Sequence, residues 1–129
     1  MAVVVLDASV VIALISPEDI HHLSAVHSLK FHAGDSLYLP ASAYSECLVV
    51  PNRQDQVQDA KSRIQELFLK IIPISEVIAE IAAELRSQHS WLRLPDAMIL
   101  ACARSIQAEV LLTGDKKWQK LDPSVRLLS

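Results

Sequence analysis

The chain has 129 residues, which suits one domain, and 51% of them are hydrophobic, which provides a packed core and argues against disorder. Its two glycines, Gly34 and Gly114, are too few for the glycine-rich loops that bind dinucleotides or nucleoside triphosphates. With 12 basic and 15 acidic residues and no basic stripe, charge alone would not hold a nucleic acid. Cys47 and Cys102 lie far apart in apolar sequence and predict neither a disulfide nor a cysteine-based zinc site.

The N-terminal apolar run does not read as a targeting or membrane segment. It has no preceding basic region and meets Asp7 after six residues. The apolar runs of the chain are far shorter than the about 20 residues that span a bilayer. We therefore expect a cytoplasmic protein without a membrane helix, with a single domain over residues 1–129.

Short apolar runs alternate with helical patterns along the chain. We predict a strand at 3–6, a helix at 8–15, a helix from Ile20 that closes near Gly34, a strand at 37–39, and a helix from Ser42 to Val49 halted by Pro51. A helix over 54–70 follows, then a short strand at 71–74 weakened by Pro73, and a helix capped by Ser75. The last elements are a helix from Pro95 to about Ile106, a strand at 110–113, a helix at 115–121 and a strand at 125–128.

Two of these helices have a clear apolar face. In the helix over 54–70 this face is Val57, Ala60, Ile64, Leu67 and Phe68, and in the helix after Ser75 it is Val77, Ile78, Ile81, Ala82 and Leu85. Alternation of strands and helices predicts an α/β fold with a central parallel sheet of four to five short strands and helices on both faces. The helices at 8–15 and 41–50 are so apolar that we expect part of their surface to remain available for association.

Two aspartates directly follow predicted strands. Asp7 ends the first strand in VLDAS, and Asp115 follows the strand in LLTGD. Parallel sheets bind ligands beyond the carboxyl ends of their strands, so both side chains should project to the same edge.

Two further acids lie in apolar surroundings, Asp96 in LPDAMILACA and Glu46 in SAYSECLVV. Burying an ionised carboxylate is costly unless it is paired or bound to a cation, so the four acids together suggest a shared Mg²⁺ or Mn²⁺ ion. Taken singly, each acid has a simpler interpretation: Asp7 and Asp115 as helix N-caps, Asp96 at the positive end of a helix dipole, and Glu46 as an exposed helix residue. On the capping interpretation, Asn in place of Asp7 or Asp96 should preserve stability and activity.

These motifs resemble those of the PIN-domain ribonucleases. Within that family, the length of the chain and the spacing of its motifs most resemble the VapC-type toxins of toxin–antitoxin pairs. The resemblance covers essentially the whole chain and is carried by VLDAS, the glutamate after the second strand, LPDAMILACA and LLTGDKKWQKL. It implies a Mg²⁺- or Mn²⁺-dependent endoribonuclease with Asp7, Glu46, Asp96 and Asp115 as metal-binding and catalytic acids. It also implies that the hydroxyls of Ser9 and Thr113 support the first and last acid.

The resemblance also bears on partners and on the basic residues near the acids. It implies an RNA substrate, a homodimer, and an antitoxin whose C-terminal segment lies over the active site. Some relatives carry a further acid where this chain has Lys116, Lys117 and Trp118, which leaves the number of metal ions open. Lys116, Lys117 and Arg93 are candidates for contacts with RNA phosphates.

Other functions remain open at this point. The domain could be a nuclease without an antitoxin, or a PIN-like module that binds RNA or protein without cutting. A phosphotransferase with Asp7 as nucleophile is disfavoured, because the second aspartate expected two residues later is replaced by Ser9.

Overall fold

The computed structural model describes residues 1–67 and 69–128, which include a single parallel sheet. Its five strands lie in the order β3-β2-β1-β4-β5, and each neighbouring pair is parallel. The strands are β1 (Val3–Leu6), β2 (Ser36–Pro40), β3 (Lys70–Ile72), β4 (Val110–Thr113) and β5 (Val125–Leu127). The predicted parallel α/β sheet is confirmed. Its centre is β1, where Val4, Val5 and Leu6 are fully buried, as expected for a strand covered on both faces.

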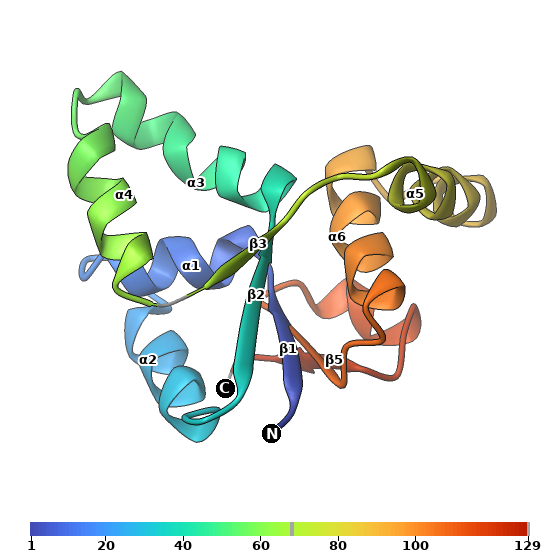
Figure 1. Cartoon of the computed structure of the whole chain (residues 1–129), viewed down its shortest axis with the longest axis horizontal. Coiled ribbons are helices and arrows are strands. Elements are labelled where there is room, and N and C mark those ends of the chain that lie inside the picture. Colours follow the sequence, from blue (N-terminus) through green and yellow to red (C-terminus); the bar gives the residue numbers. More distant parts are fainter. Residues whose placement is uncertain (68, 129) are drawn as a thin grey trace.

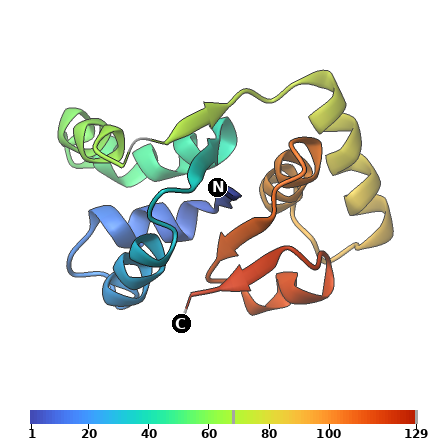
Figure 2. The ribbon, with the colours of Figure 1, turned by 60° about the horizontal axis from the view of Figure 1, so that its bottom comes forward.

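Helices cover both faces of this sheet (Figures 1 and 2). They are α1 (Ala8–Ile15), α2 (His22–Phe31), α3 (Ala41–Arg53), α4 (Val57–Gln65), α5 (Glu76–Gln88), α6 (Leu94–Ser105) and the 3-10 helix η1 (Lys116–Lys120). Helices α1 and α2 lie on one side, and α5, α6 and η1 on the other. Helix α3 follows β2 and packs against both α1 and α6, so it closes the carboxyl edge of the sheet. Within the described residues, no helix is long and apolar enough to cross a membrane.

The region between β2 and β3 differs from the prediction. Helix α3 begins at Ala41 and continues through Pro51 to Arg53, whereas we expected Pro51 to halt it. Pro51 lies in the last turn, where its missing N–H costs a single helical hydrogen bond, and the Asn52 side chain donates to the Leu48 carbonyl at 2.8 Å nearby. The chain then turns at Asp55, whose φ is 54°.

This turn shortens the helix predicted over 54–70 to α4. Ala60 and Ile64 of its predicted apolar face are buried, whereas Val57 and Leu67 are only partly buried. Phe68 of the same face lies outside the described residues.

The second half of the chain follows the prediction more closely. Ser75 caps α5 by accepting a hydrogen bond from the Ile78 amide at 3.2 Å. Ile78, Ala82 and Leu85 are buried, but Val77 is 57% exposed, so its assignment to the apolar face is wrong. Helix α6 begins at Leu94, one residue before Pro95, and the segment predicted as a helix at 115–121 is η1.

Candidate active site

The carboxyl ends of β1 and β4 bring Asp7 and Asp115 to the same edge of the sheet. The Asp7 amide donates to the Leu112 carbonyl at 3.0 Å, which fixes the end of β1 beside the end of β4. Asp96 lies in the first turn of α6, and Glu46 lies in α3, the helix that closes this edge. Of the four predicted acids only Asp7 is buried; Asp96 and Asp115 are partly exposed and Glu46 is exposed. The expectation that Asp96 is buried is therefore wrong, and Glu46 follows its alternative interpretation as an exposed helix residue.

Asp7 is held in one orientation by three hydrogen bonds. Its Oδ1 accepts from the Ala8 amide at 2.7 Å, which makes Asp7 the N-cap of α1. Its Oδ2 accepts from the Ser9 hydroxyl at 2.8 Å and from the Thr113 hydroxyl at 2.9 Å. A carboxylate oxygen accepts about two such bonds, so Oδ2 is filled and Oδ1 retains one free lone pair. Asp7 is thus a cap that still presents one oxygen to a further partner.

The direction of both hydroxyl protons is set by the backbone. Ser9 Oγ accepts from the Gly114 amide at 3.3 Å, and Thr113 Oγ1 accepts from the Asp115 amide at 3.0 Å. Each oxygen therefore uses a lone pair on the loop after β4 and directs its proton toward Asp7. Both hydroxyls support the first acid, and Thr113 also ties the backbone of the last acid to it.

The pKa values of three of the acids are raised, and the acids act on one another. Burial raises the pKa of Asp7; its hydrogen bonds from Ser9, Thr113 and Ala8 work against this, and the charge of Asp115 adds to it. Partial desolvation is also the main reason that the pKa values of Glu46 and Asp96 are raised, although the Glu46 side chain is largely exposed. The negative charge of Asp7 raises the pKa of both.

Charges of the other acids and of Arg93 also act on the pKa values of Glu46 and Asp96. Asp96 raises the pKa of Glu46, and Asp115 raises that of Asp96. The positive charge of Arg93 lowers the pKa of both Glu46 and Asp96. The structure therefore brings the four predicted acids within range of each other's charge, with Arg93 as the cation that acts on two of them.

The acids suit a hard cation by their chemistry, although they do not form a preassembled cage. Among residues 1–67 and 69–128, no three His, Cys, Asp or Glu side chains stand in an arrangement that would by itself hold a metal ion. Carboxylate oxygens are the ligands that Mg²⁺ and Mn²⁺ prefer, and the mutual repulsion of four carboxylates is what a cation relieves. The donor set therefore fits the implied metal.

The predicted basic residues all adjoin the acids in the fold. Arg93 is the N-cap residue of α6, three residues before Asp96. Lys116 and Lys117 are exposed at the start of η1, and the Lys117 amide donates to Asp115 Oδ1 at 2.9 Å, so Asp115 also caps a helix. Burial raises the pKa of the Cys47 thiol, next to Glu46, to about 12, which favours the protonated thiol at neutral pH.

The sequence did not reveal a groove beside Glu46. A groove of about 680 Å³ lies between α1, α3 and α4, and Glu46 and Cys47 contribute to its lining. Ile12, Ile15 and Val50 give it an apolar wall, and Glu18, Asp59 and Arg63 are charged residues along it. The sequence feature that could have indicated this groove is the apolar pattern of the helices predicted at 8–15 and 41–50, since residues of both line it. Most of α1 is buried, however, and the large apolar residues of α3 that are exposed are Val49 and Val50.

Comparison with known proteins places the fold. The chain belongs to the PIN domain family, which matches residues 4–123. Among solved structures, it is similar to VapBC2 from Rickettsia felis bound to a fragment of promoter DNA (16% identity, 98% of this chain and 99% of that one, TM-score 0.80). It is also similar to a toxin–antitoxin complex from Klebsiella pneumoniae (28% identity, 95% of both chains, TM-score 0.77).

A third solved structure is VapC20 from Mycobacterium tuberculosis, described as a toxin that cleaves the sarcin–ricin loop (16% identity, 92% of this chain and 94% of that one, TM-score 0.75). No curated protein is significantly similar to the chain.

Proposed function

We propose that this protein is a metal-dependent endoribonuclease that acts as the toxin of a toxin–antitoxin pair in the cytoplasm. The observation that carries the proposal is the group of four acids at the carboxyl edge of the sheet: Asp7 and Asp115 follow β1 and β4, Asp96 lies in the first turn of α6, and Glu46 lies in α3. Membership of the PIN domain family and similarity to solved toxin–antitoxin complexes support the same conclusion.

Asp7, Glu46, Asp96 and Asp115 would hold the cation. Asp7 would use the free lone pair of Oδ1, because the Ser9 and Thr113 hydroxyls already fill Oδ2. When bound, Mg²⁺ or Mn²⁺ lowers the pKa of a coordinated water and offsets negative charge on a phosphodiester.

The chain's own residues then have distinct roles. Ser9 and Thr113 favour the ionised form of Asp7 and fix its orientation, because both hydroxyls donate a hydrogen bond to its carboxylate. The four acids repel an RNA phosphate, and Arg93, Lys116 and Lys117 counter this repulsion at the rim by binding phosphate oxygens. Binding of RNA to this net-acidic protein therefore depends on a local arrangement of cations around the acids.

The groove between α1, α3 and α4 suits the C-terminal segment of an antitoxin. Its lining combines an apolar wall with Glu46, so a segment bound in it would reach one of the four acids. An arginine or lysine of that segment would pair with the carboxylates and take the place of the cation, since a guanidinium binds carboxylates through two hydrogen bonds.

The nuclease is tested by incubating the purified protein with single-stranded RNA and Mn²⁺, with and without chelator. We expect cleavage that chelator abolishes, and a loss of roughly 10²–10³-fold in E46Q and D115N, the range reported when a charge-stabilising group is removed from a reaction centre. E80Q, which removes a similar charge from the exposed face of α5, should cleave like the wild type. Metal-independent binding without cleavage would instead favour the non-cutting module.

The toxin role is tested separately from the nuclease. Overproduction should arrest growth, and co-expression of the antitoxin, which the proposal places in a short reading frame upstream of this gene, should relieve the arrest. V50E, which places a charge in the apolar wall of the groove, should weaken that relief while cleavage of RNA persists. A chain that is harmless when overproduced but cleaves RNA would be a nuclease without an antitoxin.

A further inference from the structure

The loop between α5 and α6 exposes an aromatic side chain that has no role in the nuclease proposed above. Trp91 is 48% exposed, whereas Trp118, the other tryptophan of the chain, is 1% exposed and packs in the core. Tryptophan is highly buried on average, because its large ring contributes strongly to packing. An indole that stands half in water is therefore better explained by binding than by packing.

The backbone on either side of Trp91 is fixed by several contacts. Leu92 is 1% exposed and anchors the loop in the core. Its amide donates to the His89 carbonyl at 3.0 Å, and its carbonyl accepts from Arg86 Nε at 2.7 Å. Within the described part of the chain, His89 is also the only aromatic neighbour of Trp91, with ring centroids 6.2 Å apart and ring planes inclined by 63°. The indole is therefore presented by an ordered loop, which lowers the entropy cost of binding a ligand.

Trp91 lies close to the acids along the chain. Arg93 follows two residues later as the N-cap residue of α6, and Asp96 lies in the first turn of that helix. Two residues span at most about 7 Å between Cα atoms, so Trp91 and Arg93 extend from neighbouring positions at the rim of the acids. Both are exposed, and Leu94, which is 43% exposed, adds an apolar side chain to the same short surface.

We infer that Trp91 stacks on an unpaired base of the RNA, next to the phosphate that Arg93 contacts. The inference rests on the proposed nuclease function and adds that the RNA at the site is single-stranded. An aromatic ring binds any base through its π face, and a neighbouring arginine supplies the charge that a phosphate needs. In a duplex, each base is already stacked on its neighbours, so a duplex offers no free base to the indole.

The composition of this surface favours an RNA base over a protein partner. Its exposed apolar side chains are Trp91 and Leu94, with the cation of Arg93 between them. A stable protein interface uses about 20–30 residues on each side, far more than this loop offers. One stacked base, in contrast, needs a single aromatic ring and a cation for the adjoining phosphate.

Tryptophan fluorescence of the full chain tests the stacking directly. The D96N variant is titrated with a short unstructured RNA, so that the RNA stays intact. We expect quenching of the Trp91 emission, because a stacked base quenches an indole, and no change in the emission of Trp118, which is buried. In D96N/W91F only Trp118 emits, so the quenching should disappear. A duplex of the same sequence should not quench Trp91, and equal quenching by the duplex would overturn the inference.

Dissociation constants separate stacking from charge. In fluorescence anisotropy with labelled RNA, D96N/W91L should bind roughly 5–150-fold more weakly than D96N, the range expected for the loss of one stacked base. D96N/W91F keeps an aromatic ring and should lose less. The slope of log K against log salt should be equal in all three, because the indole carries no charge. A fully abasic RNA keeps its phosphates and should bind D96N and D96N/W91L equally.

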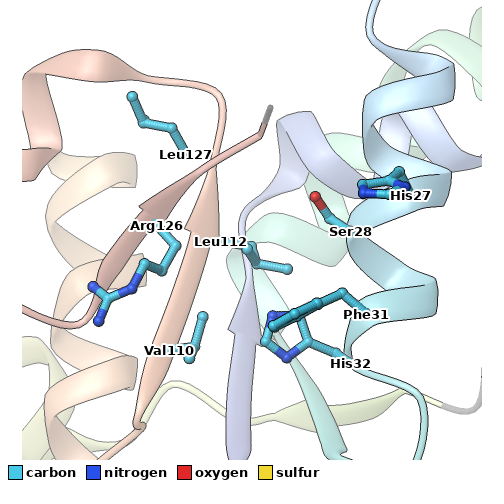
Figure 3. A pocket seen from close by; sticks show the side chains of 8 residues that line it. All are labelled: His27, Ser28, Phe31, His32, Val110, Leu112, Arg126 and Leu127. Atoms are coloured by element: carbon cyan, nitrogen blue, oxygen red, sulfur yellow. The ribbon is translucent and has the colours of Figure 1, made fainter.

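Phe31 provides the matched control for an exposed aromatic residue. It is 80% exposed, but it lies at the end of α2, beside a pocket of about 360 Å³ between that helix and the strands β4 and β5 (Figure 3). This is the side of the sheet opposite to α5 and α6. D96N/F31L should therefore bind RNA as tightly as D96N does.

Two results of the binding assay would overturn the inference: equal affinity of D96N and D96N/W91L for RNA, and an equal loss of affinity for ordinary and abasic RNA. Cleavage of RNA by the wild type without quenching of Trp91 would also overturn it and would leave the proposed nuclease standing. Quenching of Trp91 in a wild type that cleaves no RNA would support the inferred base contact and overturn the nuclease. A W91L variant that loses binding of the antitoxin but not of RNA would overturn the inference and assign Trp91 to that partner.

Discussion

The aspartates of this protein occupy two contrasting environments. At the carboxyl edge of the sheet, the pKa values of Asp7 and Asp96 are raised, first by burial and then by neighbouring acids. Away from that edge, the pKa of Asp35 is lowered by hydrogen bonds from the Ala2 amide and from His32. Burial would raise the pKa of Asp122, but hydrogen bonds from Ser124 and the nearby Arg104 bring it below the ordinary value.

The contrast is visible in the contacts. Asp122 Oδ1 accepts from the Ser124 amide at 2.9 Å and from its hydroxyl at 2.6 Å, and Oδ2 lies 3.4 Å from Arg104 Nε. Among the described residues, Asp96 has no comparable hydrogen bond. Acids that are paired by hydrogen bonds or a cation, such as Asp122, stabilise the fold, whereas acids that repel one another destabilise it. The cluster of mutually repelling acids at the carboxyl edge is therefore explained by function better than by folding.

The largest expected effect is the loss of cleavage when Asp96 or Asp7 is replaced by Asn; the two variants should differ in stability. D96N and D7N should each reduce Mn²⁺-dependent cleavage roughly 10²–10³-fold. Without metal, D96N should melt at the wild-type temperature or above it, because the substitution removes repulsion and breaks no hydrogen bond. D7N should melt lower than the wild type, in contrast to the capping interpretation, on which Asn caps about as well as Asp. Asn has one acceptor oxygen, and Asp7 uses both of its oxygens to accept three hydrogen bonds.

Melting temperatures with and without Mn²⁺, measured beside the cleavage assay, check both variants. The stabilisation that Mn²⁺ gives the wild type should largely vanish in each. Full Mn²⁺-dependent cleavage by D96N would mean that Asp96 serves only the helix dipole.

The next effect concerns the hydroxyl that joins the first and last acids. Thr113 is fully buried, and T113V removes both its hydrogen bond to Asp7 and the acceptor of the Asp115 amide. We expect a loss of about 1–3 kcal/mol in urea unfolding, as for other buried groups left unsatisfied. The pKa of Asp7 should rise further, which would move the acid limb of the cleavage–pH profile to higher pH.

T113S should restore both the stability and the pH profile, because it keeps the hydroxyl. S9A should cost less than T113V, since Ser9 is exposed and water can replace its oxygen. A pH profile unchanged in T113V would show that the hydroxyl supports the fold alone.

The two environments also predict opposite responses to acid. The pKa of Asp122 is lowered in the folded state, so its stabilisation is present above the unfolded value of about 3.8 and is lost as the pH falls below it. The pKa of Asp96 is raised, so as the pH falls toward 3.8 from above, its protonation relieves repulsion and adds stability. Melting temperatures between pH 7 and pH 3 should therefore fall less steeply in D122N and more steeply in D96N than in the wild type. Parallel curves for the two variants would contradict the division of the acids into two groups.

The sequence predicted most of the sheet because its strands are buried apolar runs that have few alternative structures. It also located Asp7 and Asp115, since both directly follow such runs. The extent of α3 was not predictable from Pro51, because tertiary packing tolerates a proline in the last turn of a helix. Burial of Glu46 was inferred from its apolar neighbours, but the helical period turns Glu46 outward while Cys47 faces the core. Exposure of the apolar residues on α2 also depends on packing, which no local pattern reports.

The smallest expected effect concerns the lysines after Asp115. Phosphate binding by these lysines would sharpen the contrast, because it would show that functional basic residues border the acidic edge. Each phosphate contact to single-stranded RNA contributes about 0.7 to the slope of log K against log salt. K116A/K117A should therefore reduce the slope by about 1.4 if both lysines bind phosphate, and weaken binding about equally for all RNA sequences. The measurement uses D96N, so that cleavage does not interfere, and K120A as the control, since Lys120 is also exposed in η1 but at its far end from Asp115. An unchanged slope in the double variant, or an equal change in K120A, would mean that Lys116 and Lys117 make no specific contact with RNA phosphates.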